Sequence, residues 1–155
     1  MTVLILGIGN SLLSDEGVGI HAIRYLEEHH PDSQGVRYLD GGTIGFPLAS
    51  EIAQSDSLIV IDASELDGDV GDIELFEGAA MDRFLGRQRK LTVHEVGLRD
   101  LLATSQLLDE LPRRRALLGI QPMTVSWGEE PTHRVAAAIP KVCDMALKLV
   151  ERWMV

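Results

Sequence analysis

Two uninterrupted apolar runs constrain the fold of this chain more than any other feature of its sequence. The first covers Val3 to Leu6 and ends at Gly7-Ile8-Gly9, and the second covers Leu58 to Ile61 and ends at Asp62. Short apolar runs without polar alternation are typical of strands that are buried on both faces, as in parallel sheets covered by helices. The two runs therefore predict central strands of an α/β protein.

The rest of the chain alternates between strand and helix patterns. Short apolar segments predict further strands at Val36 to Leu39, Ile73 to Phe76 and Ala116 to Ile120. Apolar residues at helical spacing predict helices from Val18 to just before Pro31, from Pro47 to about Ala53, from about Val96 to Leu108 and from about Thr132 to Trp153. Only a tight turn separates the fourth strand from the third, so we expect it to run antiparallel. This alternation predicts a three-layer α/β/α sandwich with a mostly parallel sheet and right-handed crossovers.

Length and charge narrow the class of protein. The chain has 155 residues, 45% of them apolar, which is enough for a single domain covering residues 1–155. Its 14 basic and 24 acidic side chains give a net charge of -10, which argues against nucleic acid as the partner. No stretch approaches the roughly 18 apolar residues of a membrane span, and no basic start precedes the first apolar run. We therefore expect a cytoplasmic protein, and nothing in the sequence demands more than a monomer.

Three acidic residues follow strand ends and mark the candidate site. They are Glu16, Asp40 and Asp62. Ligands bind open α/β sheets outside the carboxyl ends of the strands, where the strand order reverses. If the order begins 2-1-3, Glu16 and Asp62 face the same crevice, and two carboxylates there need a cation or a proton. His94, at a loop-to-helix junction, can add a neutral nitrogen, and such mixed ligation suits zinc, nickel or cobalt better than calcium or magnesium.

Each of these residues also has an ordinary structural interpretation. A carboxylate just past a strand is often a helix cap or a turn former, which applies to both Asp40 and Asp62, and a lone histidine such as His94 is more often a surface or capping residue. His21 is better explained as a satisfied helix histidine than as part of the site. The only cysteine, Cys143, is expected to pack in the last helix. The run from Arg113 to Arg115 is expected to be the solvated start of a strand.

Competing motifs are incomplete. The segment after the first strand begins like a dinucleotide fingerprint, but Leu12 occupies the third glycine position, and the acidic Asp15-Glu16 pair would repel a pyrophosphate. His94-Glu95 begins like a zinc-protease helix, yet Leu98 stands where the second histidine belongs. No serine lies in a Gly-x-Ser-x-Gly elbow.

The motifs, taken together, resemble those of the hydrogenase maturation endopeptidases. The most specific match is the segment that runs from Gly7 through Asn10-Ser11-Leu12 and Asp15-Glu16 to Gly19. Asp40-Gly41-Gly42-Thr43 is similar to a second motif of the family, the strand ending at Asp62 to a third, and His94-Glu95-Val96-Gly97-Leu98 to a looser block. The similarity covers most of the chain.

This resemblance implies a fold and a site. It implies a five-stranded mixed sheet with helices on both faces, and with the pattern above we predict the strand order 2-1-3-5-4 with strand 4 antiparallel. It places Glu16, Asp62 and His94 on the metal ligands and catalytic residues of the family. It also places the segment Asp40, Gly41, Gly42 and Thr43 near the substrate.

The resemblance also implies an activity. Family members remove a short C-terminal extension from the large-subunit precursor of nickel-iron hydrogenase, so we expect a metal-dependent endopeptidase whose nickel arrives with the substrate. Other divalent ions are expected to occupy the site in vitro. Two alternatives stay open from the sequence. One is a non-catalytic metal-sensing chaperone of the same precursor, and the other is a small-molecule metallohydrolase.

Overall fold

The computed structural model describes residues 2–31, 33–42, 47–87, 93–123 and 127–154. The strands are β1 (Val3–Ile8), β2 (Val36–Gly42), β3 (Ser57–Ala63), β4 (Ile73–Glu77) and β5 (Arg114–Ile120). The helices are the short 3₁₀ helix η1 (Ser14–Gly17) and the α-helices α1 (Val18–His29), α2 (Pro47–Ala53), α3 (Ala79–Arg87), α4 (Val93–Leu107) and α5 (His133–Met154).

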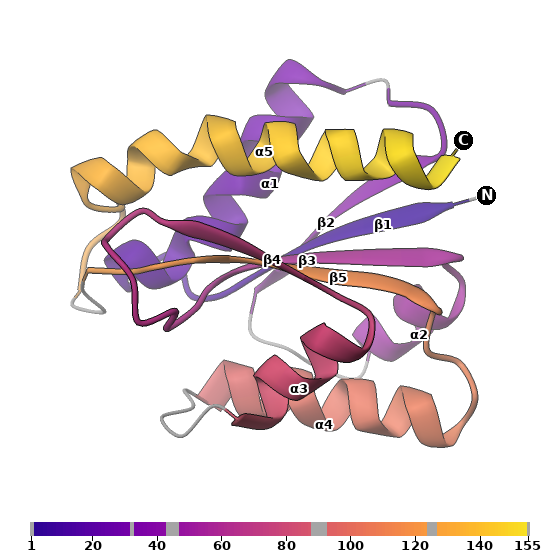
Figure 1. Cartoon of the computed structure of the whole chain (residues 1–155). Helices are drawn as coiled ribbons and strands as arrows, with labels where there is room; N and C mark the ends of the chain where they lie inside the picture. The colour runs from indigo at the N-terminus through magenta and orange to yellow at the C-terminus, as the bar shows by residue number, and fades with distance from the viewer. Residues whose placement is uncertain (1, 32, 43–46, 88–92, 124–126, 155) are drawn as a thin grey trace.

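The strands form one mixed sheet between two layers of helices. Its order is β2-β1-β3-β5-β4, with every neighbouring pair parallel except β4 and β5. Helices α1 and α5 cover one face, and α2, α3 and α4 cover the other (Figure 1). The predicted α/β/α sandwich, its strand order and the antiparallel fourth strand are therefore confirmed. Across the part of the chain that the structure describes, no helix is both long and apolar enough to span a membrane.

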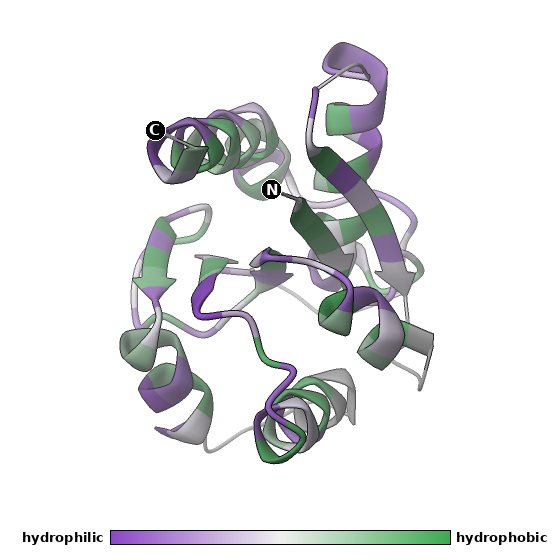
Figure 2. Ribbon diagram, turned by 90° about the vertical axis from the view of Figure 1, so that its right-hand side faces the viewer, coloured by the Kyte–Doolittle hydropathy of each residue, from purple (hydrophilic) through white to green (hydrophobic). Residues whose placement is uncertain are grey.

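Complete burial of the two central strands explains their apolar sequences. Every residue of β1 and β3 is buried, and the strands pair in parallel from Val3 opposite Ser57 to Gly7 opposite Ile61. Alternate side chains enter opposite cores: Val3, Ile5, Ile59 and Ile61 pack with α1 and α5, whereas Leu4, Leu6, Leu58 and Val60 pack with α2, α3 and α4. Each such side chain contributes about 1.5–3 kcal/mol by burial. Figure 2 shows β1 almost wholly apolar, while the edge strand β2 carries polar bands.

Glycines bring α1 unusually close to the sheet. A Cβ atom on Gly19 would lie 2.3 Å from the carbonyl oxygen of Ile61, and one on Gly7 would lie 2.2 Å from the carbonyl oxygen of Gly19. Any larger residue would push the helix away from β1 and β3. The beginning of α1 is therefore fixed directly against the carboxyl end of β3.

The structure corrects two details of the sequence prediction. Helix α3 was not predicted, because only Met81 and Leu85 of its nine residues are fully inward. Helix α4 begins at Val93 rather than near Val96, so the backbone of His94 lies in the first helical turn and not in a loop before it.

The sequence suggested that the arginine run at the start of β5 is solvated. In the structure, two of its arginines instead contact helices. Arg115 contacts Asp82 of α3 through two nitrogens, with Nε 3.1 Å from Oδ1 and Nη2 2.5 Å from Oδ2. This hydrogen bond, more than any other influence, raises the pKa of the Arg115 guanidinium. Arg114 donates to the carbonyl oxygen of Trp153 at the end of α5. The two arginines therefore tie β5 to helices on opposite faces of the sheet.

Candidate active site

Glu16 lies in a tightly constrained turn after β1. All four residues of η1 are buried, and Glu16 is only 5% exposed. The segment after β1 can approach the Glu16 backbone this closely only because Gly9 has no side chain. The φ of Gly9 is +133°, and a Cβ atom there would lie 2.0 Å from the carbonyl oxygen of Glu16. The glycine-rich segment thus fixes the backbone that carries the Glu16 carboxylate.

Asp15, next to Glu16, connects η1 to two distant segments of the chain. Its side chain is fully buried, and Oδ2 accepts hydrogen bonds from the Met123 N–H at 2.8 Å and from Thr132 Oγ1 at 2.9 Å. Oδ1 accepts from the Thr132 N–H at 2.6 Å and from Thr132 Oγ1 at 3.0 Å. Asp15 therefore ties η1 to the chain after β5 and to the start of α5. The partners of Asp15 lie 108 and 117 residues away, so no local sequence pattern could predict these contacts. The one available signal is Thr132, a typical capping residue before a helix.

Asp62 comes from the neighbouring strand. It is the sixth residue of β3, stands opposite Gly119 of β5 in the parallel register, and is 2% exposed. Helix η1 contacts β3, and Gly19 packs on Ile61 directly before Asp62. The crossover after β1 passes over one face of the sheet through α1, and the crossover before β3 passes over the other through α2 (Figure 1). The segments that carry Glu16 and Asp62 thus meet at the strand-order reversal that the sequence predicted.

The remaining predicted site residues are placed only in part. Asp40 is exposed at the end of β2, and its Oδ1 accepts a hydrogen bond from the Gly42 N–H at 2.9 Å, the contact of a turn former. A Cβ atom on Gly41 would lie 2.8 Å from the Leu6 side chain, so this segment packs closely on β1. Thr43 and the side chain of His94 lie outside the described residues.

The chemistry of the pair follows from burial and charge. Carboxylates as buried as Glu16 and Asp62 are stable only with hydrogen-bond donors, a cation or a proton beside them. Among the described side chains, which do not include that of His94, no group of three or more histidine, cysteine, aspartate or glutamate residues is arranged to hold a metal ion. The described part of the site consequently consists of two buried carboxylates, one on η1 and one on β3.

A hollow of about 400 Å³ opens beside the Glu16 turn. Its lining comes from the loop after β1, from α1 and from the segment before α5: Ser11, Leu12, His21, Arg24, Glu129 and Glu130. His21 Nε2 lies 3.1 Å from the carbonyl oxygen of Glu129, in agreement with a satisfied helix histidine. Burial, followed by the neighbouring Arg24 cation, lowers the pKa of His21. The hollow therefore combines charged groups of both signs with one apolar wall.

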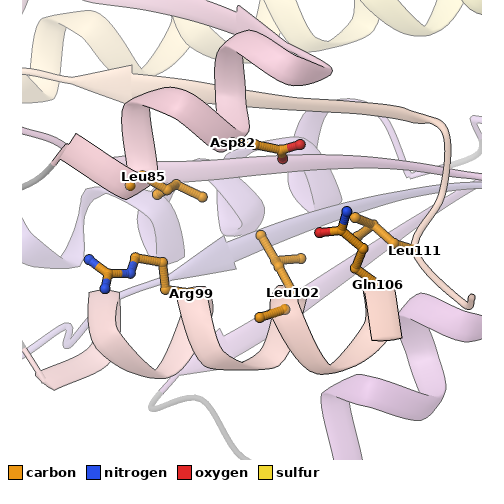
Figure 3. Close-up of a pocket in the computed structure, with 8 residues that line it drawn as sticks. Asp82, Leu85, Arg99, Leu102, Gln106 and Leu111 are labelled. Atoms are coloured by element: carbon orange, nitrogen blue, oxygen red, sulfur yellow. The ribbon is translucent and has the colours of Figure 1, made fainter. Parts of the chain in front are cut away.

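A second hollow, of about 160 Å³, lies between α3 and α4 (Figure 3). Leucine side chains from both helices and from the segment before β5 form part of its wall, and Asp82, Arg99 and Gln106 also line it. None of its lining residues belongs to the predicted site. Cys143 is also separate from the site: it packs in α5 with Sγ 3.4 Å from the Ala22 carbonyl oxygen, and burial raises the pKa of its thiol to about 12.

The fold defines an α/β protein in which two buried carboxylates, those of Glu16 and Asp62, lie on segments that meet at the switch point of a mainly parallel sheet. The family model for hydrogenase maturation protease matches residues 20–149. The chain therefore belongs to the hydrogenase maturation protease family, as its motifs had predicted, and the members of this family are endopeptidases that process hydrogenase precursors.

Individual relatives support this assignment over nearly the whole chain. The hydrogenase expression/formation protein HupD of Rhizobium leguminosarum bv. viciae is 32% identical over 152 residues, which are 97% of this chain and 75% of that protein. The hydrogenase maturating endopeptidase HybD from Escherichia coli superposes with a TM-score of 0.90 at 29% identity, covering 98% of this chain and 93% of that one. The [NiFe] hydrogenase maturation protease HybD from Thermococcus kodakarensis gives a TM-score of 0.81 at 30% identity, with 96% and 99% coverage.

Proposed function

We propose that this chain is a metal-dependent endopeptidase that removes a short C-terminal extension from the nickel-loaded large-subunit precursor of a nickel-iron hydrogenase. The observation that carries the proposal is the contact between η1 and β3, which bring the two almost fully buried residues Glu16 and Asp62 to the same end of the sheet in a hydrogenase maturation protease. We further propose that the protein acts as a monomer in the cytoplasm.

The donor set suits a divalent cation. A cation between two buried carboxylates offsets the cost of removing both charges from water. Glu16 and Asp62 would hold it with His94, whose backbone lies in the first turn of α4. The nickel belongs to the substrate, since the precursor brings it to the site. A bound divalent ion polarises a scissile carbonyl or lowers the pKa of an attacking water.

The residues of this chain then have separate tasks. Glu16 and Asp62, fixed by η1 and β3, orient the loaded precursor so that only the peptide bond near its metal reaches the site. A carboxylate oxygen that is not engaged with metal accepts the proton of the attacking water as general base. The segment Asp40 to Thr43 at the end of β2 contacts the substrate beside the site. Recognition of the metal by this chain makes processing depend on nickel loading.

The proposal is tested by incubating nickel-loaded and nickel-free precursor with purified protein and measuring the precursor mass. Wild-type protein is expected to shorten only the loaded precursor. Glu16→Gln and Asp62→Asn keep the side-chain shapes and are expected to slow processing at least about 100-fold. Glu28→Gln and Asp100→Asn are matched controls on exposed helix positions, and they should process at the wild-type rate.

Each outcome has a definite meaning. Wild-type rates for Glu16→Gln would contradict the assignment of this carboxylate. Equal cleavage of nickel-free precursor would contradict nickel dependence while leaving the endopeptidase activity intact. Tight binding of the loaded precursor with no change in mass would favour the non-catalytic chaperone.

A further inference from the structure

Large apolar side chains are exposed beside the Glu16 turn. In the part of the chain that the structure describes, Leu12 is 50% exposed, Met123 is 69% exposed and Trp127 is 80% exposed. Leu12 lies four residues before Glu16, and the other two lie between β5 and α5. We refer to Leu12, Met123 and Trp127 as the apolar rim. Tryptophan and methionine are enriched in the buried centres of protein interfaces, so their exposure here indicates a contact surface.

Hydrogen bonds join the two segments of the apolar rim. The Gly128 N–H donates to the Leu12 carbonyl oxygen at 2.8 Å, and the Ser14 N–H donates to the Gly128 carbonyl oxygen at 2.8 Å. Leu13 and Gly128 form a parallel bridge, so Leu12 and Trp127, one residue earlier on each segment, are neighbours across it. The Met123 N–H is held by the Asp15 carboxylate. The rim is thus attached to the same turn that positions Glu16.

The hollow of about 400 Å³ continues from the rim, because Leu12 lines it as well. Its volume falls within the usual range of ligand sites, about 300–1,000 Å³. Glu129 and Glu130, two and three residues after Trp127, add exposed carboxylates to its lining, while Arg24 adds one cation. The whole chain carries a net charge of -10. This combination fits an apolar side chain followed by a basic one.

Other exposed leucines of the chain lie far from the candidate site, unlike the apolar rim. Leu107 and Leu108 are also exposed, at 88% and 62%, but they follow α4 and precede the start of β5. They therefore lie at the opposite end of the parallel strands from Glu16 and Asp62, and the hollow lining includes neither of them. The apolar rim, in contrast, belongs to the segments that are hydrogen-bonded to each other and to the Glu16 turn.

We propose that the apolar rim and the adjoining hollow bind an extended segment of the precursor protein, with an apolar side chain between Leu12 and Trp127 and a basic side chain against Glu129 and Glu130. The inference rests on the proposed function and adds to it the surface that selects the substrate. The rim supplies affinity, and the buried carboxylates supply the chemistry.

The test measures binding and processing separately. Binding of nickel-loaded precursor is measured with the Glu16→Gln protein, alone and combined with Leu12→Ser or Trp127→Ser. Each rim substitution is expected to weaken binding at least about tenfold. In otherwise wild-type protein the same substitutions should raise KM by a similar factor and leave kcat unchanged. The Glu129→Gln, Glu130→Gln double variant should weaken binding most at low salt, because its effect is electrostatic. Leu107→Ser and Leu108→Ser are the matched controls and should change neither KM nor binding.

Three outcomes would overturn the inference. The first is wild-type KM and binding for both rim variants, with unfolding midpoints unchanged. The second is an equal loss of binding in the rim variants and in the controls at positions 107 and 108. The third is a wild-type dimer that Trp127→Ser dissociates, which would assign the rim to a second copy of the chain. If wild-type protein fails to shorten the precursor at all, the proposed function fails instead, and the binding measurement still decides the role of the rim.

Discussion

The most demanding prediction concerns Asp15, whose carboxylate is fully buried and accepts hydrogen bonds from the Met123 N–H, the Thr132 N–H and Thr132 Oγ1. Asp15→Ala removes the acceptor of two part-buried backbone N–H groups, and the loss of each acceptor costs about 1–3 kcal/mol. We therefore expect a loss of about 2–6 kcal/mol in the free energy of unfolding. Asp15→Asn keeps one oxygen, and the Thr132 hydroxyl can rotate to accept from the new amide, so only one N–H is stranded and about 1–3 kcal/mol is lost.

Urea unfolding provides the assay. With a slope of roughly 2 kcal/mol per molar urea, Asp15→Ala should lower the midpoint by about 1–3 M with the slope unchanged. Asp56→Ala is a matched control: Asp56 also accepts a backbone N–H, from Thr2 at 2.8 Å, but it is exposed. Its loss should cost no more than about 0.5 kcal/mol. Equal midpoints for Asp15→Ala and wild type, or a larger loss for asparagine than for alanine, would refute the argument.

Three further predictions follow from Gly9, Cys143 and His21. Gly9→Ala should displace the Glu16 backbone, because its Cβ would lie 2.0 Å from the Glu16 carbonyl oxygen, and both the unfolding midpoint and the rate of precursor shortening should fall. Burial raises the pKa of the Cys143 thiol from 9.0 to about 12, so the unfolded chain loses this proton at lower pH than the folded protein. The free energy of unfolding should therefore fall from pH 9 toward pH 12, and this pH dependence should be absent in Cys143→Ala. The pKa of His21 is lowered from 6.5, so the unfolded chain gains this proton first and stability should fall as pH drops through 6.5, less steeply in His21→Gln; an NMR titration gives the midpoint directly.

Each of these has a control or a contrary result. Gly86→Ala, at a helical glycine with open space around it, should be neutral or stabilising by about 0.5–1 kcal/mol, which separates steric displacement from the general effect of the exchange. Rapid alkylation of Cys143 in the native protein at pH 8 would contradict its burial. A His21 titration midpoint above 6.5 would show that its carbonyl contact outweighs desolvation.

Much of the fold could be predicted because its decisive signals are local. The apolar runs of β1 and β3 reflect burial on both faces, and right-handed crossovers leave few ways to order the strands. Helix α3 gave no such signal, since Met81 and Leu85 alone cannot distinguish a short helix from a loop. Arg115 was misjudged because its partner Asp82 lies 33 residues away in a helix that had not been predicted.

In the candidate site, too, residues placed by topology could be predicted, whereas contacts between distant segments could not. Glu16 and Asp62 could be chosen because topology alone places the ends of neighbouring strands together. Asp15 was treated with Glu16 as half of an acidic pair, although its carboxylate accepts hydrogen bonds from two segments that follow β5. Sequence adjacency cannot show which of two neighbouring carboxylates turns inward to the Met123 and Thr132 donors, because that choice depends on a helix more than a hundred residues later.

The partners of Asp15 also determine when, during synthesis of the chain, the Glu16 turn can gain its supporting hydrogen bonds. Synthesis reaches the Glu16 turn more than a hundred residues before the donors at Met123 and Thr132, so the turn lacks these contacts until both donors have been made. A nascent chain that stops after β4 would carry both acidic residues without the support that shapes the turn. Any function that depends on the position of the Glu16 carboxylate therefore also depends on residues that are synthesised much later.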